Sequence, residues 1–158
     1  MTRHIVTEAV VLKAKAFSEA DRKILFLSPE LGLLDAFVYG TARGKSRLAS
    51  GTDTLSGGLL YLYHDPVKGV YKVTDLKSSN LFLGIKNSLP KYYRALLWSE
   101  IIIKSLGGQD SSKVVFSLFH SCLEWLDKLE SPAALDLINL QFLWRYLSYQ
   151  GYTMGTEY

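Results

Sequence analysis

The first half of the chain alternates apolar and polar residues with a period of two, up to about residue 78. This repeat is typical of β-strands that bury one face. Turn-forming residues such as Pro29 and Gly32 interrupt it at short intervals. The pattern predicts five strands, over residues 3–13, 23–28, 33–39, 58–64 and 70–77. Short strands with one longer connection, between the third and the fourth, predict a small closed barrel over residues 1–79.

From residue 80 to residue 158 the apolar residues recur every three or four positions, which is the repeat of helices with a buried face. Ser131 followed by Pro132 is a strong start signal, because serine caps a helix and proline suits its first position. Gly151 suits the position just after a helix. The expected helices cover residues 92–106, a segment from Ser111 or Ser112 onward, and a segment from Ser131 to about Gln150. The chain is therefore expected to be of the α+β class, a five-stranded barrel followed by a helical domain.

The same patterns predict which large residues are buried. Leu60 and Leu62 are expected to fill the barrel, which leaves Tyr61 and Tyr63 facing outward on the fourth strand. There the tyrosines either stack against a ligand or pack against the helical domain. The aromatic residues of the second half are expected in the helical core: Tyr92, Tyr93, Trp98, Trp125, Phe142, Trp144, Tyr146 and Tyr149.

Composition narrows the class of protein. Of 158 residues, 48% are apolar and 21% are charged, which is typical of a globular protein and not of a disordered one. The apolar runs are too short for a membrane span, and Glu8 lies too near the N-terminus for a signal peptide. Cys122 is the one cysteine, so we expect neither a disulfide nor a cysteine-based metal site, and we expect its thiol to be buried. A reducing, cytoplasmic location fits this composition.

The net charge of +3 is unevenly distributed. Residues 1–80 hold 11 Lys and Arg against 8 Asp and Glu, whereas residues 81–158 hold 7 of each. The segment from Ala36 to Thr52 has no acidic residue and contains three cations, Arg43, Lys45 and Arg47. Such a basic loop suits a polyanion, although a solvent-exposed loop that uses charge for solubility has the same composition.

Residues 40–46, Gly-Thr-Ala-Arg-Gly-Lys-Ser, resemble the phosphate-binding loop of nucleotide hydrolases. That motif needs four residues between its glycines, but three separate Gly40 from Gly44, and Tyr39 stands where the first glycine is required. Residues 48–51 are also a poor helix start. The three histidines are scattered and no catalytic group of residues is evident, so we expect no catalytic residues, no metal site and no cofactor.

Five short motifs together resemble one family. They are Glu8–Leu12, Ser18–Asp21, Glu30–Gly32, Tyr39–Gly40 and Lys45–Ser46. Their order and spacing resemble the N-terminal barrel of the RecO family, the bacterial recombination mediators. The end of the helical half, Gln150-Gly151-Tyr152, resembles the helical domain of the same family.

The resemblance implies an oligonucleotide-binding (OB) fold and a protein that binds single- and double-stranded DNA in DNA repair and recombination. It implies strand annealing, binding to the acidic C-terminal tail of the single-strand-binding protein, and action with RecR to help load the recombinase. It implies no enzyme activity and a cytoplasmic, nucleoid-associated protein. Family chains usually continue past the Gly-Tyr pair, many with a zinc-binding cysteine cluster, so this sequence fits a fragment or a shortened member.

An OB groove combines a cationic track with aromatic side chains on which bases stack. The candidate DNA contacts are Lys13, Lys15, Arg22, Lys23, Tyr39, Arg43, Lys45 and Arg47. A binding site for an acidic, phenylalanine-ended tail needs an apolar pocket beside a cation. The candidates for that cation are Lys104, Lys113 and Arg145.

Two other functions remain open at this point. One is a nucleotide hydrolase that uses residues 40–46, which ATP turnover would reveal. The other is a protein-interaction module without DNA binding, which a titration with an oligonucleotide would reveal.

Overall fold

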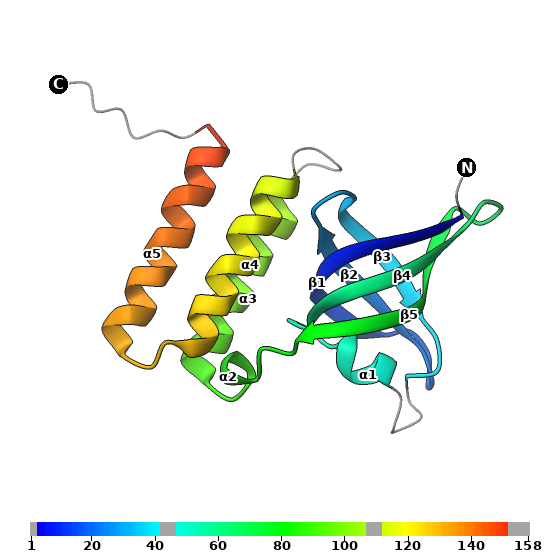
Figure 1. Cartoon of the computed structure of the whole chain (residues 1–158), viewed down its shortest axis with the longest axis horizontal. Helices are drawn as coiled ribbons and strands as arrows, with labels where there is room; N and C mark the ends of the chain where they lie inside the picture. Colours follow the sequence, from blue (N-terminus) through cyan, green and yellow to red (C-terminus); the bar gives the residue numbers. More distant parts are fainter. Residues whose placement is uncertain (1–2, 42–46, 107–111, 152–158) are drawn as a thin grey trace.

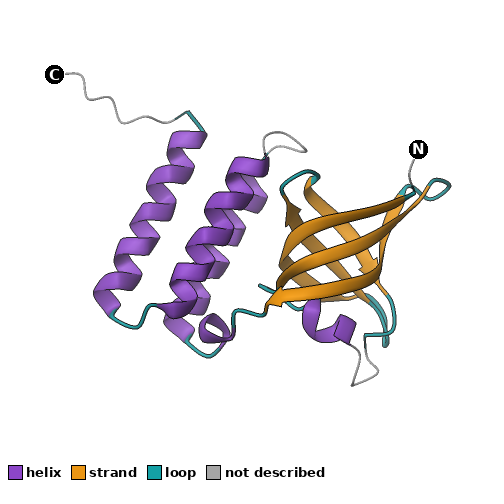
Figure 2. Cartoon of the chain, in the orientation of Figure 1, coloured by secondary structure: helices purple, strands orange, loops and turns teal. Residues whose placement is uncertain are grey.

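The computed structural model describes residues 3–41, 47–106 and 112–151. A five-stranded barrel stands beside a group of helices, with strands and helices segregated along the molecule (Figure 1, Figure 2). The barrel part comprises β1 (His4–Ala16), β2 (Arg22–Ser28), β3 (Gly32–Val38), α1 (Arg47–Gly51), β4 (Gly57–Asp65) and β5 (Val70–Asn80). The helical part comprises α2 (Leu83–Lys86), α3 (Leu89–Ser105), α4 (Ser112–Lys128) and α5 (Pro132–Tyr149).

The barrel closes in the order β1-β2-β3-β5-β4, with β1 pairing with both β2 and β4. The long β1 pairs with β4 through its first half, His4–Val10, and with β2 through its second half, Val10–Ala16, and its register with β2 shifts between Val11 and Lys13. Neighbouring strands are antiparallel except β3 and β5, which are parallel and joined at one register pair, Phe37 and Lys72. The prediction of a closed five-stranded barrel followed by a helical domain is confirmed.

The barrel interior follows from the alternation of side chains along each strand. Leu60 and Leu62 are almost fully buried, as predicted, while Tyr61 between them is 37% exposed. The buried core of the barrel consists of Ala9, Val11, Ile24, Phe26, Ala36, Val38, Leu60, Leu62, Val73 and Leu76.

Helix α1 lies at one end of the barrel (Figure 1). The guanidinium of Arg22 donates a 2.7 Å hydrogen bond to the carbonyl of Ala49 and a 3.1 Å bond to the Thr52 hydroxyl. The helix that residues 48–51 join is only five residues long and ends at Gly51, which agrees with the prediction of a poor helix start there. So short a helix is unstable in isolation, and the contacts with Arg22 help to hold it.

The helical core is built on stacked aromatic rings. Phe142 of α5 lies 4.8 Å from Trp98 of α3 and 5.6 Å from Tyr146, measured between ring centroids. The Trp98 indole N–H donates to the Asn139 side-chain oxygen at 2.8 Å. As predicted, the Ser131 hydroxyl caps α5 by accepting from the N–H of Ala134.

The prediction that the second-half aromatics are core residues is wrong for four of them. These four are Tyr93, Trp125, Trp144 and Tyr149, which are 55–65% exposed. On α5 the exposed apolar residues also recur at three- and four-residue steps: Leu137, Leu140, Trp144 and Leu147. The helix thus has two apolar stripes, and spacing alone does not distinguish the buried stripe from the exposed one.

The barrel and the helices share one apolar core. Val10, Leu12 and Leu27 on the outside of the barrel belong to the same buried cluster as Phe82 and Phe119. Three polar links cross the same junction: the Ser112 hydroxyl donates to the Pro29 carbonyl, Lys86 donates to the Ser56 hydroxyl, and Lys13 pairs with Glu100 at 3.2 Å. The junction therefore holds the barrel against α3 and α4.

Candidate nucleic-acid interface

A belt of cationic and aromatic side chains winds around the barrel, from one end of β1 to the other. Consecutive members are register partners on neighbouring strands, and the belt begins and ends on the long strand β1. We call it the barrel belt; its members are Lys15, Lys23, Phe37, Lys72, Tyr63 and His4. Their strand neighbours, such as Ile24, Ala36, Val38, Leu62 and Val73, are buried inside the barrel. The alternation of a strand therefore directs the members of the belt outward.

Three aromatic rings form a row across part of this belt. The ring centroids of Phe17 and Phe37 are 5.0 Å apart, and those of Phe37 and Tyr39 are 6.3 Å apart. Phe17 is 59% exposed and Tyr39 is 45% exposed. We call Phe17, Phe37 and Tyr39 the aromatic row.

Two lysines of the barrel belt lie against this row. The Lys23 Nζ is 5.7 Å from the centroid of the Phe37 ring, and the Lys72 Nζ is 5.2 Å from that of the Tyr39 ring. Both distances are within the range of a cation–π contact. The site thus combines charge and ring faces, the two features that proteins use to bind single strands.

The turn between β1 and β2 holds the row in place through Asp21. One carboxylate oxygen of Asp21 accepts from the Ser18 hydroxyl at 2.9 Å, and the other accepts from the N–H of Gly40 at 3.1 Å. The Asp21 carbonyl also accepts from the N–H of Phe17. One residue therefore links the segment that carries Phe17 to the end of the strand that carries Tyr39.

The structure brings some of the DNA contacts predicted from the sequence together and separates others. Lys15, Lys23 and Tyr39 come together in the barrel belt and the aromatic row. Lys13 pairs with Glu100 of α3, and Arg22 holds α1.

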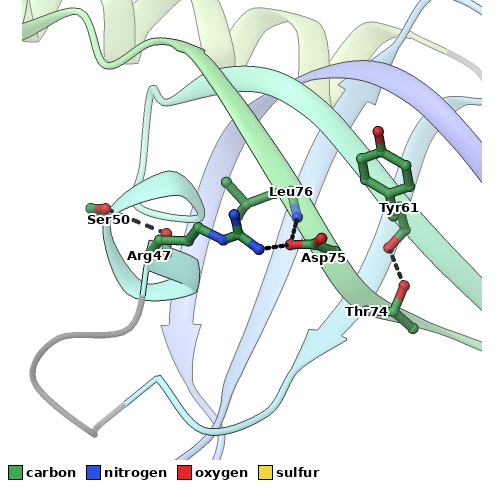
Figure 3. Close-up of polar contacts among 6 residues, drawn as sticks. All are labelled: Arg47, Ser50, Tyr61, Thr74, Asp75 and Leu76. Carbon is green, nitrogen blue, oxygen red and sulfur yellow. Dashed lines mark hydrogen bonds and ion pairs between the residues drawn. The ribbon is translucent and has the colours of Figure 1, made fainter.

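The basic loop gives a different result. Arg43 and Lys45 lie outside the described residues. Arg47, on α1, reaches Asp75 of β5 at 2.6 Å (Figure 3), although both side chains remain largely exposed. Asp75 also accepts from the N–H of Leu76, so the ion pair fixes α1 to the edge of β5. Arg47 consequently has a protein partner and is a weaker candidate for a phosphate contact than Lys15 or Lys23.

Sequence reasoning missed Phe17, Phe37 and Lys72. Phe37 lies between two buried residues of its strand, Ala36 and Val38, so alternation along the strand points its side chain outward. The sequence alone contains this alternation. Lys72 comes beside Phe37 only because β3 and β5 meet when the barrel closes, and no local pattern records that pairing.

A second candidate site is a groove of about 740 Å³ between α4 and α5. Its apolar lining includes Trp125, Leu137 and Ile138, and its cations are Lys113 and Arg145. Lys104, the third partner candidate, instead pairs with Glu100 at 3.5 Å and does not line the groove. Cys122 also lines the groove, where burial raises the pKa of its thiol to about 11.

Within the described ranges, no group of three or more His, Cys, Asp or Glu is arranged to hold a metal ion. Among the helices of those same ranges, none is long and apolar enough to cross a membrane.

Comparison with known sequences assigns both halves of the chain. The family described as Recombination protein O N terminal matches residues 1–82, and Recombination protein O C terminal matches residues 86–156. Three similar proteins are each named DNA repair protein RecO. The one from Dehalococcoides mccartyi is 28% identical over 80% of this chain and 49% of its own length.

The relative from Synechococcus elongatus is 27% identical over 100% of this chain and 58% of its own length. The relative from Heliobacterium modesticaldum is 28% identical over 92% of this chain and 50% of its own length. The chain thus spans about half the length of the curated relatives it matches. With both family regions matched in order over nearly all of its residues, the chain belongs to the RecO family of recombination proteins.

Proposed function

We propose that this protein acts in DNA repair and recombination by binding single- and double-stranded DNA without sequence specificity. The observation that carries the proposal is the barrel belt, in which three lysines and three aromatic side chains surround the barrel and none of the six members is acidic. The names of the curated relatives, DNA repair protein RecO, agree with it.

The pairing of like charges in the belt supports a polyanionic ligand. Lys15 and Lys23 are direct cross-strand partners, and both are exposed. Like charges in this position repel each other and destabilise a sheet. A phosphate between them would remove the repulsion, so binding to DNA gives a physical reason for this pair.

We propose binding without sequence preference because contacts with phosphates do not depend on which bases the DNA carries. A protein that covers phosphates reduces repulsion between two strands, and complementary strands can then pair without an energy source. We therefore propose strand annealing without nucleotide hydrolysis, in the cytoplasm and in association with the nucleoid.

We further propose that the groove between α4 and α5 binds the acidic C-terminal tail of the single-strand-binding protein. Its lining offers apolar contacts for a terminal aromatic residue, and Lys113 and Arg145 offer charge for carboxylates. Binding this tail would bring the protein to covered single strands, where it would help the recombinase replace the single-strand-binding protein. Cooperation with RecR is proposed on family membership.

The test of DNA binding is fluorescence anisotropy of a labelled single-stranded oligonucleotide over a range of salt concentrations. If about four phosphates are neutralised, the slope of log K against log salt is about −3. A slope near zero, or no binding at low salt, contradicts the proposal. Turnover of ATP with Mg²⁺ under the same conditions would favour a nucleotide hydrolase instead.

A further inference from the structure

We infer that the aromatic row, Phe17, Phe37 and Tyr39, makes the barrel select single-stranded over double-stranded DNA by stacking on unpaired bases. The inference rests on the proposed function of the barrel belt as a DNA site and adds a specificity to it. Lysines attract both forms of DNA, because both carry phosphates. Ring faces distinguish them, because bases within a duplex are already stacked on one another.

The spacing of the row supports this inference. Adjacent ring centroids are 5.0 and 6.3 Å apart, whereas neighbouring bases on one strand of a duplex rise by about 3.4 Å. Bases held at the duplex spacing do not match these rings one to one. Phe17 also meets Phe37 edge to face, at an interplanar angle of 67°, so the rings do not form one parallel stack, and an extended single strand can separate and turn its bases to fit them.

Exposure of the rings also supports it. The outer members, Phe17 and Tyr39, are 59% and 45% exposed, although a phenyl ring gains by burial. None of the three rings belongs to the apolar core that the barrel shares with the described helices, where Val10, Leu12 and Leu27 are the barrel's contribution. A stacked base would cover apolar ring surface that the fold itself leaves in water.

The two lysines over the rings complete the arrangement. Lys23 lies over Phe37 and Lys72 lies over Tyr39, both with exposed side chains. A lysine ammonium on a flexible stem can leave a ring face for a phosphate while a base takes its place on the ring. Each ring–lysine pair is therefore suited to one nucleotide, with the base on the ring and the phosphate on the lysine.

The experiment compares a double variant, Phe17→Leu with Tyr39→Leu, with the unaltered protein. Binding is measured by anisotropy with one mixed-sequence single strand and with the same sequence annealed as a blunt duplex. Both positions are exposed, so the fold should persist, and circular dichroism checks this. Tyr93→Leu is the matched control, because Tyr93 is an exposed aromatic residue on α3, away from the row.

The expected result is a loss of about tenfold or more in single-strand affinity, with duplex affinity and the salt slope unchanged. An equal loss for both forms of DNA, or no loss for either, would overturn the inference while leaving the proposed DNA binding in place. If the unaltered protein binds neither form, the proposed function fails first and the inference falls with it.

A second double variant, Lys23→Gln with Lys72→Gln, should weaken the binding of both forms of DNA and make the salt slope less steep. If the lysine variant loses affinity for single-stranded DNA alone, the selectivity comes from charge and the inferred role of the rings is wrong.

Discussion

The carboxylate of Asp127, near the end of α4, accepts a 3.0 Å hydrogen bond from the backbone N–H of Ile85 in the short helix α2. Gly84 makes this contact possible, because a Cβ at that position would lie 2.4 Å from the Asp127 carbonyl oxygen. The Lys91 ammonium donates to the same carbonyl at 3.1 Å. These contacts hold the connection between barrel and helices against α4.

Replacement of Asp127 by Ala should therefore destabilise the protein by about 1 kcal/mol, because it removes one of the two acceptors of the Ile85 N–H and leaves the Phe82 carbonyl, at 3.1 Å, as the other. Asp127→Asn keeps a side-chain oxygen and should retain most of the stability. Urea denaturation of the three proteins measures the difference. If the Ala and Asn variants unfold at the same urea concentration, the hydrogen bond between Asp127 and Ile85 does not contribute to stability.

The two stripes of α5 should differ sharply in their contribution to stability. Phe142 is fully buried between Trp98 and Tyr146, so Phe142→Ala should cost about 3–5 kcal/mol. Leu140 is 62% exposed on the same helix, so Leu140→Ala should cost less than about 1 kcal/mol. Thermal unfolding compares the two variants. A large loss for Leu140→Ala would mean that its stripe is covered in solution.

Lysines of the barrel belt should contribute to DNA binding in proportion to the phosphates that they neutralise. Changing Lys15 to Gln should make the single-strand salt slope less steep by about 0.7. The same change at Lys128, near the end of α4 and outside the barrel belt, is the control and should leave the slope unaltered. Identical slopes for the Lys15 variant and the unaltered protein would remove that lysine from the site.

The groove between α4 and α5 allows a matched test with two exposed tryptophans. Trp125 lines the groove, whereas Trp144 does not, and the two are 61% and 55% exposed. Trp125→Ala and Arg145→Glu should each weaken binding of an acidic, phenylalanine-ended peptide by roughly tenfold or more. Trp144→Ala should have little effect. Isothermal titration measures all three, and a loss confined to Trp144→Ala would place the peptide elsewhere.

Cys122 should react slowly with alkylating reagents in the folded protein. Burial favours the neutral thiol and raises its pKa from an ordinary value of 9.0 to about 11, and the thiolate is the reactive form. The raised pKa contributes stability that is complete below about pH 9 and is lost as the pH rises toward 11. Labelling by iodoacetamide near pH 8, with and without denaturant, tests this. Equal rates in both conditions would show that the thiol is accessible in the fold.

Alternation was enough to predict the barrel, because strand residues that fill a barrel repeat every second position. Leu60, Leu62 and the outward Tyr61 are where that rule places them. The alternation of apolar and polar residues does not predict the short helices α1 and α2. Each is held by a distant polar partner in addition to its own backbone hydrogen bonds, Arg22 for α1 and Asp127 for α2.

The candidate site was predicted in part for the same reason. Lys15, Lys23 and Tyr39 could be named from the sequence because they flank turns in a basic half of the chain. Their assembly with Phe37 and Lys72 depends on which strands become neighbours, which is a property of the closed barrel. On α5, equal spacing of two apolar stripes explains why helical periodicity predicts Trp144 in the core although it is exposed, whereas Tyr149 has the spacing of the buried stripe and is exposed at the last residue of the helix.

The limited pairing between β3 and β5 has a thermodynamic consequence for any ligand of the barrel belt. These strands are joined at one register pair, Phe37 and Lys72, so this seam is the weakest in the barrel wall. A DNA strand that contacts both residues would bridge the seam and bind the closed barrel more tightly than an opened one. Ligand concentration would then set how often the seam opens, and amide hydrogen exchange along β3 and β5 would slow as the site fills.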